Sequence, residues 1–291
     1  IEKVFPIPFH TKEKFDLMYN FDIEDEATSL AQELKSEKKF GFFKENGYLS
    51  AFNFGAEYYL NTIFDDELKK TNKKTYQEMM FDAAELPYKK EKPKIYLNKE
   101  EKLYAENFLK KNHLSSSNVI GLHLGVSPRW PSKAWHQSRI EEFIFMAKKE
   151  GYEILFFSGP DEDEEKILKL LKNLNQKKIT LIRNNPHNTI RQFSSLVNLC
   201  KAIICSDSFA LHISLSLNKP TVGLFFCTSP DEVEGYDLLK KIASPRLYEF
   251  FPERMNEYDE ELVKSISPEE ILAAIKDINQ HSPILKWKKK K

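Results

Sequence analysis

Residues 206–212 carry side chains well suited to chemistry, in the order Ser-Asp-Ser-Phe-Ala-Leu-His. They stand between two apolar runs, 201–205 and 211–217, and this pattern predicts a strand, a turn and a helix with Asp207 or Ser208 at the N-cap. The free N–H groups and the dipole at a helix N-terminus attract anions. His212 comes one helical turn after Ser208, so both side chains would share the mouth of that helix. Taken alone, a plain N-cap beside a buried histidine is the favoured interpretation of this segment, and only the rest of the chain reverses that preference.

A second polar loop, residues 125–135, follows the apolar run 119–124 and reads Gly-Val-Ser-Pro-Arg-Trp-Pro-Ser-Lys-Ala-Trp. Ser127, Arg129 and Lys133 would supply a hydroxyl and two cations. Charged donors of this kind suit a diphosphate. The alternative is a surface loop that its tryptophans anchor.

Two further loops follow predicted strands. In residues 158–162, Asp161 or Glu162 could bind ribose hydroxyls or simply complement a helix N-terminus. Residues 184–188 end at Asn188, just before a predicted helix, and caps and turns alone would account for them. Ligands of open α/β sheets bind beyond the carboxyl ends of the strands. Four such polar loops therefore predict a nucleotide-diphosphate site.

The elements that would position these loops alternate regularly from residue 118 onward. We expect strands at 119–124, 152–157, 179–182, 202–205 and 221–225, and helices at 136–150, 161–174, 189–199, 208–217 and 267–278. Alternating strands and helices imply right-handed βαβ units and a parallel sheet covered on both faces. This half of the chain is predicted to be a Rossmann-like, doubly wound domain.

The first half is less regular. It predicts strands at 15–21 and 38–43 and helices at 26–35, 75–84 and 100–111, with a polar and aromatic stretch at 44–75 that we leave unassigned. Residues 113–117 are the expected hinge. We therefore predict a first Rossmann-like domain at 1–113 that lacks its opening βαβ unit, a second at 114–280 and a basic tail at 281–291.

Composition excludes some classes of protein. The 44 basic and 44 acidic residues balance, so no global field selects nucleic acid. Cys200, Cys205 and Cys227 are odd in number and lack metal-ligand spacing, which favours a reducing compartment. Without a signal peptide or a run of transmembrane length, we expect a cytoplasmic protein. The tail 287–291, Trp-Lys-Lys-Lys-Lys, would suit anionic lipid at the inner membrane surface, although four lysines are more often simply solvated.

Taken together, these motifs resemble glycosyltransferase family nine, which contains the bacterial ADP-heptose:lipopolysaccharide heptosyltransferases. The resemblance rests on residues 125–135, 158–162 and 207–212, continues through 218–220 and 225–230, and includes 15–22, 27–34 and 38–42 upstream. It implies an α/β fold of GT-B type, with two Rossmann-like domains that face each other across a cleft. It also implies an inverting, metal-independent transfer, without a cofactor, from an ADP-linked sugar to a glycolipid or oligosaccharide acceptor like the lipopolysaccharide core.

Carried over position by position, the resemblance assigns Lys133 to the donor diphosphate and Asp161, or Glu162, to the nucleoside. It puts Asn188 near the base. The donor sugar and phosphate fall to the segment that holds Asp207, Ser208, Phe209 and His212.

The chain departs from the family pattern in two places. Phe209 stands where the family commonly has glycine, and we expect its ring to crowd the donor sugar. The family's proposed base is an aspartate in a Gly-Asp turn that opens the N-terminal domain. No such turn occurs in the first half of this sequence, so we expect the base to lie before Ile1 and assign no catalytic residue.

Two other classes of protein share parts of this pattern. A non-catalytic or degenerate nucleotide-sugar-binding module would share the same loops. An NAD-dependent oxidoreductase is disfavoured, because no Gly-x-Gly-x-x-Gly follows a predicted strand.

Overall fold

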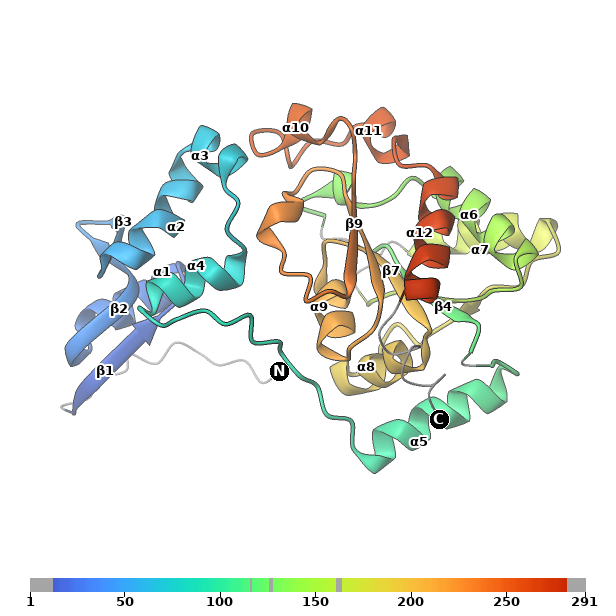
Figure 1. Ribbon diagram of the computed structural model, residues 1–291, viewed down its shortest axis with the longest axis horizontal. Helices are drawn as coiled ribbons and strands as arrows, with labels where there is room; N and C mark the ends of the chain where they lie inside the picture. Colours follow the sequence, from blue (N-terminus) through green and yellow to red (C-terminus); the bar gives the residue numbers. More distant parts are fainter. Residues whose placement is uncertain (1–12, 116, 126–127, 161–163, 282–291) are drawn as a thin grey trace. The chain divides into compact units, whose positions relative to one another are not determined.

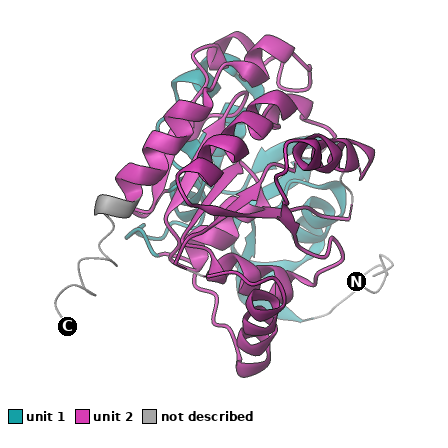
Figure 2. Ribbon diagram, turned by 90° about the vertical axis from the view of Figure 1, so that its right-hand side faces the viewer, with its two compact units in different colours: residues 1–91, 231–234 teal, residues 92–230, 235–291 magenta. Residues whose placement is uncertain are grey.

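The computed structural model describes residues 13–115, 117–125, 128–160 and 164–281. The chain forms two compact units (Figure 2): unit 1 contains residues 1–91 and 231–234, and unit 2 contains 92–230 and 235–291. The division therefore falls between Glu91 and Lys92, not at the predicted 113–117 hinge. Helix α5 (Lys99–Lys111) belongs to unit 2 because it packs against α8 (Ile190–Leu199), where Arg191 and Glu101 form a salt bridge of 2.6 Å.

Unit 2 is built on a six-stranded sheet in the order β6-β5-β4-β7-β8-β9, and every neighbouring pair is parallel. The strands are β4 (Val119–His123), β5 (Glu153–Phe157), β6 (Ile182–Arg183), β7 (Ala202–Ser206), β8 (Thr221–Phe225) and β9 (Leu239–Ala243). Every residue of β7 and β8 is buried, as expected of parallel strands covered on both faces.

Helices cover both faces of this sheet, with α6, α7 and α12 on one side and α8 and α9 on the other (Figure 1). Their bounds are α6 (Gln137–Lys149), α7 (Glu164–Gln176), α9 (Phe209–Ser216) and α12 (Pro268–His281). The connection from β4 goes outward through α6, whereas α8 returns the chain from the sheet edge to the centre. The strand order therefore reverses between β4 and β7, and this topological switch point is where open α/β sheets bind their ligands.

Local signals explain where several helices begin. Thr189 and Gln192 form a capping box at the start of α8. Asn98 and Glu101 do the same for α5. The predicted start of α12 is confirmed, because Ser267 Oγ accepts from the backbone N–H of Glu270 at 3.2 Å.

Unit 1 contains a three-stranded sheet with β1 (Lys14–Asn20) parallel to β2 (Lys35–Glu45) and β2 antiparallel to β3 (Tyr48–Ala51). Helix α1 (Asp25–Glu33) connects the parallel pair, and α2 (Phe54–Phe64), α3 (Asp66–Thr71) and α4 (Tyr76–Ala83) follow. A small core holds these elements together and consists of Phe42, Ala56, Leu60 and Ala83.

The predicted elements of both halves occur, within a few residues at their ends. The elements that were not predicted include β3, α2 and α3 in the unassigned stretch, and β9, α10 (Leu247–Phe250) and α11 (Glu260–Lys264) near the C-terminus. The two parts of the chain have α/β architecture with parallel strands, as the sequence predicted.

Candidate functional site

Lys133 and Asp207 meet at the switch point of the sheet in unit 2. Lys133 follows β4 and Asp207 follows β7, and these strands are neighbours. The distance from Lys133 Nζ to Asp207 Oδ2 is 3.0 Å, and the two side chains are only 12% and 20% exposed. The structure therefore brings together two residues that the sequence had assigned separately to the donor.

Lys133 is held in place by its backbone as well as by its charge. It ends a short 3₁₀ turn, η1 (Pro131–Lys133), and its N–H donates to the carbonyl of Trp130 at 3.1 Å. The buried Ser206 donates from Oγ to the Lys133 carbonyl at 2.7 Å, which ties the loop to the end of β7. These bonds fix the backbone of the loop at Lys133.

The ring of Trp130 contacts both cations of this loop. Lys133 Nζ lies 4.8 Å and the guanidinium carbon of Arg129 lies 4.9 Å from the ring centroid. Both distances fall within the range of cation–π contacts, so one indole ring contacts both positive charges. Ser127, the hydroxyl predicted for the same loop, lies outside the described residues.

Cys227 borders the Lys133–Asp207 pair from the loop that follows β8. Burial raises the pKa of the Cys227 thiol to about 11, while the Lys133 charge acts to lower this pKa and the Asp207 charge acts to raise it. A thiol with this pKa stays protonated near neutral pH. Cys227 therefore adds no charge beside the pair near neutral pH.

Helix α9 begins at the same place, and its N-cap is Ser208. The Ser208 side chain makes no capping hydrogen bond, and the Asp207 carboxylate pairs with Lys133 instead. Of the two candidates for the N-cap, Asp207 was thus wrong. The Ser208 side chain therefore leaves the first N–H groups of α9 without a side-chain cap, as a helix N-terminus that binds an anion requires.

Phe209 and His212 lie on the first turn of α9. Phe209 is 52% exposed, and the side chain of His212 is also exposed. The expectation that His212 shares the mouth of the helix with Ser208 agrees with its place one turn into α9, but its exposure contradicts the alternative of a buried histidine.

An aromatic cluster that the sequence did not reveal lies beside this turn. The Phe193 ring of α8 contacts Phe209 at 6.0 Å, Phe157 at 5.1 Å and His123 at 5.8 Å between centroids. Burial lowers the pKa of His123 to about 4, so this imidazole is neutral at physiological pH. His123 was not among the predicted site residues. In the sequence it is distinguished only as a histidine within the apolar run 119–124.

Asn188 lies at the same sheet edge, but on the far side of the site. It precedes α8, and its Nδ2 donates to Tyr104 Oη at 2.6 Å, while Asn184 Nδ2 donates to its Oδ1 at 3.2 Å. The hydrogen bonds of its side chain go to Tyr104, Asn184 and Gln192 and not to Lys133 or Asp207. It borders β6, three strands from β7.

Asp161 and Glu162, the predicted ribose ligands, lie outside the described residues. The next described acid in this loop is Glu164, which pairs with Arg183 through two hydrogen bonds of 2.7 and 2.6 Å. Arg183 also donates to Ser158 Oγ at 2.6 Å. These bonds tie the loop after β5 to β6.

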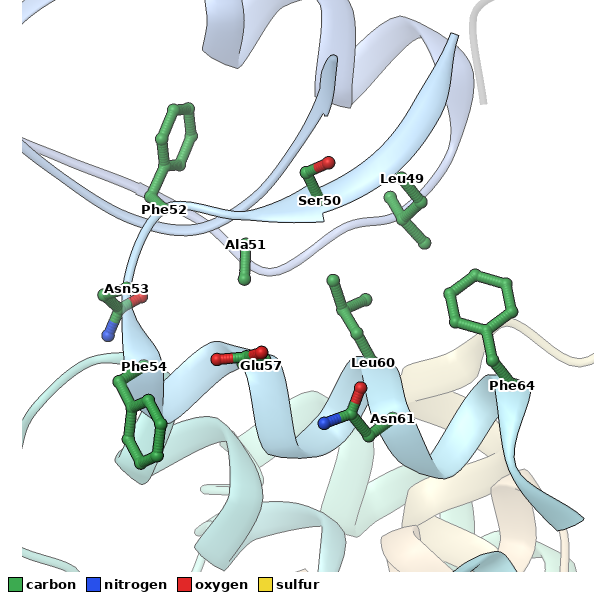
Figure 3. A pocket seen from close by; sticks show the side chains of 10 residues that line it. All are labelled: Leu49, Ser50, Ala51, Phe52, Asn53, Phe54, Glu57, Leu60, Asn61 and Phe64. Atoms are coloured by element: carbon green, nitrogen blue, oxygen red, sulfur yellow. The ribbon is translucent and has the colours of Figure 1, made fainter. Parts of the chain in front are cut away.

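Unit 1 contains an open hollow of about 500 Å³ between β3 and α2 (Figure 3). Side chains of both elements line it, among them Leu49, Leu60, Asn61 and Phe64. None of the predicted donor residues belongs to it. Its lining offers one carboxylate, Glu57, and no cation, which does not suit a diphosphate.

In the ranges that the structure describes, no three His, Cys, Asp or Glu side chains are grouped so that they could hold a metal ion. No described helix combines the length and the apolar character needed to cross a membrane.

Curated relatives of this sequence are heptosyltransferases. It is 27% identical over 205 residues to lipopolysaccharide heptosyltransferase 2 of Escherichia coli strain K12, which covers 68% of this chain and 53% of that protein. It is 29% identical over 160 residues to the enzyme of the same name from Salmonella typhimurium, with 53% and 43% covered. The chain thus spans about half the length of the curated relatives it matches.

Solved structures show the same architecture. A glycosyl transferase family 9 protein from Veillonella parvula superimposes with a TM-score of 0.67 at 18% identity, covering 93% of this chain and 75% of its own. The E. coli ADP-heptose lps heptosyltransferase II gives a TM-score of 0.54 at 26% identity, with 67% and 56% covered. The sequence model of glycosyltransferase family 9 (heptosyltransferase) matches residues 11–259, which is most of the chain. This protein belongs to glycosyltransferase family 9.

Proposed function

We propose that this protein transfers a sugar, most simply heptose, from an ADP-linked donor to an acceptor like the lipopolysaccharide core. The observation that carries the proposal is the Lys133–Asp207 pair of 3.0 Å at the switch point of the sheet, beside the N-terminus of α9. Relatives named as lipopolysaccharide heptosyltransferases and a related structure named for ADP-heptose support the choice of donor and acceptor.

The donor would lie along the carboxyl edge of the sheet. Its diphosphate would contact Lys133 and the N–H groups of α9, and its base would reach toward Asn188. These two ends are three strands apart, which corresponds to about 14 Å at the usual strand spacing. An extended nucleotide sugar can bridge such a distance.

In the proposed reaction, an acceptor hydroxyl attacks the anomeric carbon on the face opposite the diphosphate. The bond from that carbon to the diphosphate oxygen breaks, and the configuration inverts. Lys133, with Arg129 beside it on the Trp130 ring, and the N-terminus of α9 would stabilise the charge on the leaving nucleoside diphosphate. These protein donors can do this without a metal, and the base that takes the hydroxyl proton is not assigned.

The Lys133–Asp207 pair would rearrange when the donor binds. Lys133 would turn to the phosphate, because an anion with two charges attracts it more strongly than a single carboxylate does. Asp207 would then be free to accept a hydrogen bond from a sugar hydroxyl. The pair thus keeps both charges compensated until the donor replaces that contact.

Acceptor binding and membrane contact stay predictions. The basic tail that suggested contact with the inner membrane, residues 287–291, lies outside the described residues. A glycolipid or oligosaccharide acceptor is proposed on the names of the relatives alone.

A second candidate is a nucleotide-sugar-binding module without transferase activity. Phe209 favours it, because its ring is 52% exposed at the residue that follows the N-cap, where it would crowd the sugar.

The experiment that tests the proposal is a panel of ADP-, UDP- and GDP-linked sugars. Binding is measured by thermal shift, and turnover is measured as nucleoside diphosphate released in the presence of a core oligosaccharide. Stabilisation by the ADP-linked heptose together with acceptor-dependent release of ADP is the expected result. Binding without release would favour the non-catalytic module, and the absence of binding to any donor would contradict both.

A further inference from the structure

Two buried hydroxyl oxygens lie at the carboxyl ends of β7 and β8. Within the described part of the chain, neither Ser208 Oγ nor Thr228 Oγ1 has a hydrogen-bond partner. Thr228 is only 7% exposed. Buried polar groups are nearly always hydrogen-bonded, so a hydroxyl to which the protein offers no partner is a sign that it serves a ligand.

Thr228 belongs to the same edge as the Lys133–Asp207 pair. It directly follows Cys227, the thiol whose pKa responds to both of those charges. Strands β7 and β8 are neighbours, with Ser206 opposite Leu224, so the loops after them leave the sheet side by side. The hydroxyl therefore lies in the group of residues to which we assign the diphosphate and the sugar.

We infer that Thr228 is a further ligand of the nucleotide-sugar donor, with its hydroxyl donating a hydrogen bond to an oxygen atom of the donor. The inference rests on the proposed function of the site. Phosphate oxygens and sugar oxygens both accept such a bond, and Ser208 offers a second hydroxyl of the same kind from the next strand. Thr228 thereby extends the site from the switch point to the loop after β8.

Thr221 provides a matched contrast at the opposite end of β8. It is also a fully buried threonine, but its Oγ1 lies 2.8 Å from Ser214 Oγ and donates to the Lys219 carbonyl at 2.9 Å. Its hydroxyl thus has partners within the fold, whereas that of Thr228 has none among the described residues. The two residues allow one substitution to be compared at a partnered and at an unpartnered position.

The test replaces each threonine by valine, which keeps the shape and removes the hydroxyl. Thr228→Val should leave the Tm of the whole chain unchanged or higher, and should weaken donor binding in calorimetry by about fivefold to tenfold. Thr228→Ser should restore the affinity. Thr221→Val should show the reverse, with a lower Tm and unchanged affinity.

Comparing ADP with an ADP-linked sugar identifies the atom that Thr228 contacts. A loss for both ligands places its partner on the phosphate, and a loss for the sugar nucleotide alone places it on the sugar. An unchanged affinity of Thr228→Val for both, or a fall in its Tm like that of Thr221→Val, would overturn the inference while the proposed function stands. Failure of the unchanged protein to bind either ligand would overturn the proposed function, and the inference with it.

Discussion

His123 ends the central strand β4 as a neutral, half-buried imidazole. Burial lowers its pKa from 6.5 to about 4, and its ring packs edge-on against Phe193. Phe193, on helix α8, also contacts Phe209 on α9. His123 therefore supports the first turn of α9 indirectly, through the ring of Phe193.

A pH dependence of stability follows. Between pH 6.5 and pH 4 the unfolded chain binds a proton at this histidine and the folded chain does not, so the free energy of unfolding falls as the pH falls. The contribution should be about 2 kcal/mol between pH 7 and pH 5. Urea unfolding at both values measures it, and His123→Gln should lose this part of the pH dependence.

His187 is a suitable control for that measurement, because it is exposed in the loop before α8. His187→Gln should keep the pH dependence of the unchanged protein. Equal pH dependence in all three proteins would show that His123 does not carry the effect.

At the residue scale, the sequence indicated Lys133 and Asp207 as candidate site residues but did not predict that they form a pair. Lys133 and Asp207 were assigned from loops that follow apolar runs, but nothing in their spacing indicated a contact of 3.0 Å between them. Asp207 had been a candidate for the cap because aspartate is common there. The Asp207 carboxylate pairs instead with Lys133, which lies in the loop after β4. This contact joins residues distant in sequence, so local preferences could not predict it.

The central element of unit 2 is β4, and close packing explains why residue 121, in the middle of this strand, is glycine. A Cβ atom there would lie 2.5 Å from Ile203 Cδ1, 2.8 Å from Phe157 Cε2 and 3.0 Å from Cys200 Sγ. All three neighbours belong to the covered interior of the sheet, so none can move away freely.

Gly121→Ala should therefore lower the free energy of unfolding by about 1–3 kcal/mol through overpacking. Chemical denaturation of the two proteins measures the difference. An alanine variant as stable as the unchanged protein would show that β4 and the helices on it are packed more loosely than described.

The elements that the sequence missed share weak local signals. Strand β9 lies at the edge of the sheet and carries two lysines, so it lacks an apolar run. Helix α2 begins after Asn53, whose side chain accepts from the Gly41 N–H and donates to the Ala83 carbonyl instead of capping the helix. In both places, contacts distant in sequence replaced the local signal.

At the scale of the whole molecule, the sequence predicted an α/β protein of two parts and the order of elements in unit 2. It set the boundary about twenty residues too late, since α5 looked like the last helix of the first part. Periodicity alone could not reveal that α5 packs against α8, because an amphipathic helix has the same pattern whichever partner it covers.

The central claim is that the switch point of unit 2 binds the diphosphate of a nucleotide sugar through Lys133. Calorimetric titration of ADP into the unchanged protein and Lys133→Ala tests it most directly. A charged hydrogen bond contributes about 1.5–3 kcal/mol, so the affinity should fall roughly tenfold or more. Lys177→Ala is the control, because Lys177 follows the end of α7 and pairs with Glu141 of α6 instead of with Asp207. The predicted result is a weaker affinity of Lys133→Ala for ADP and an unchanged affinity of Lys177→Ala. Equal affinity of all three proteins for ADP would contradict the account.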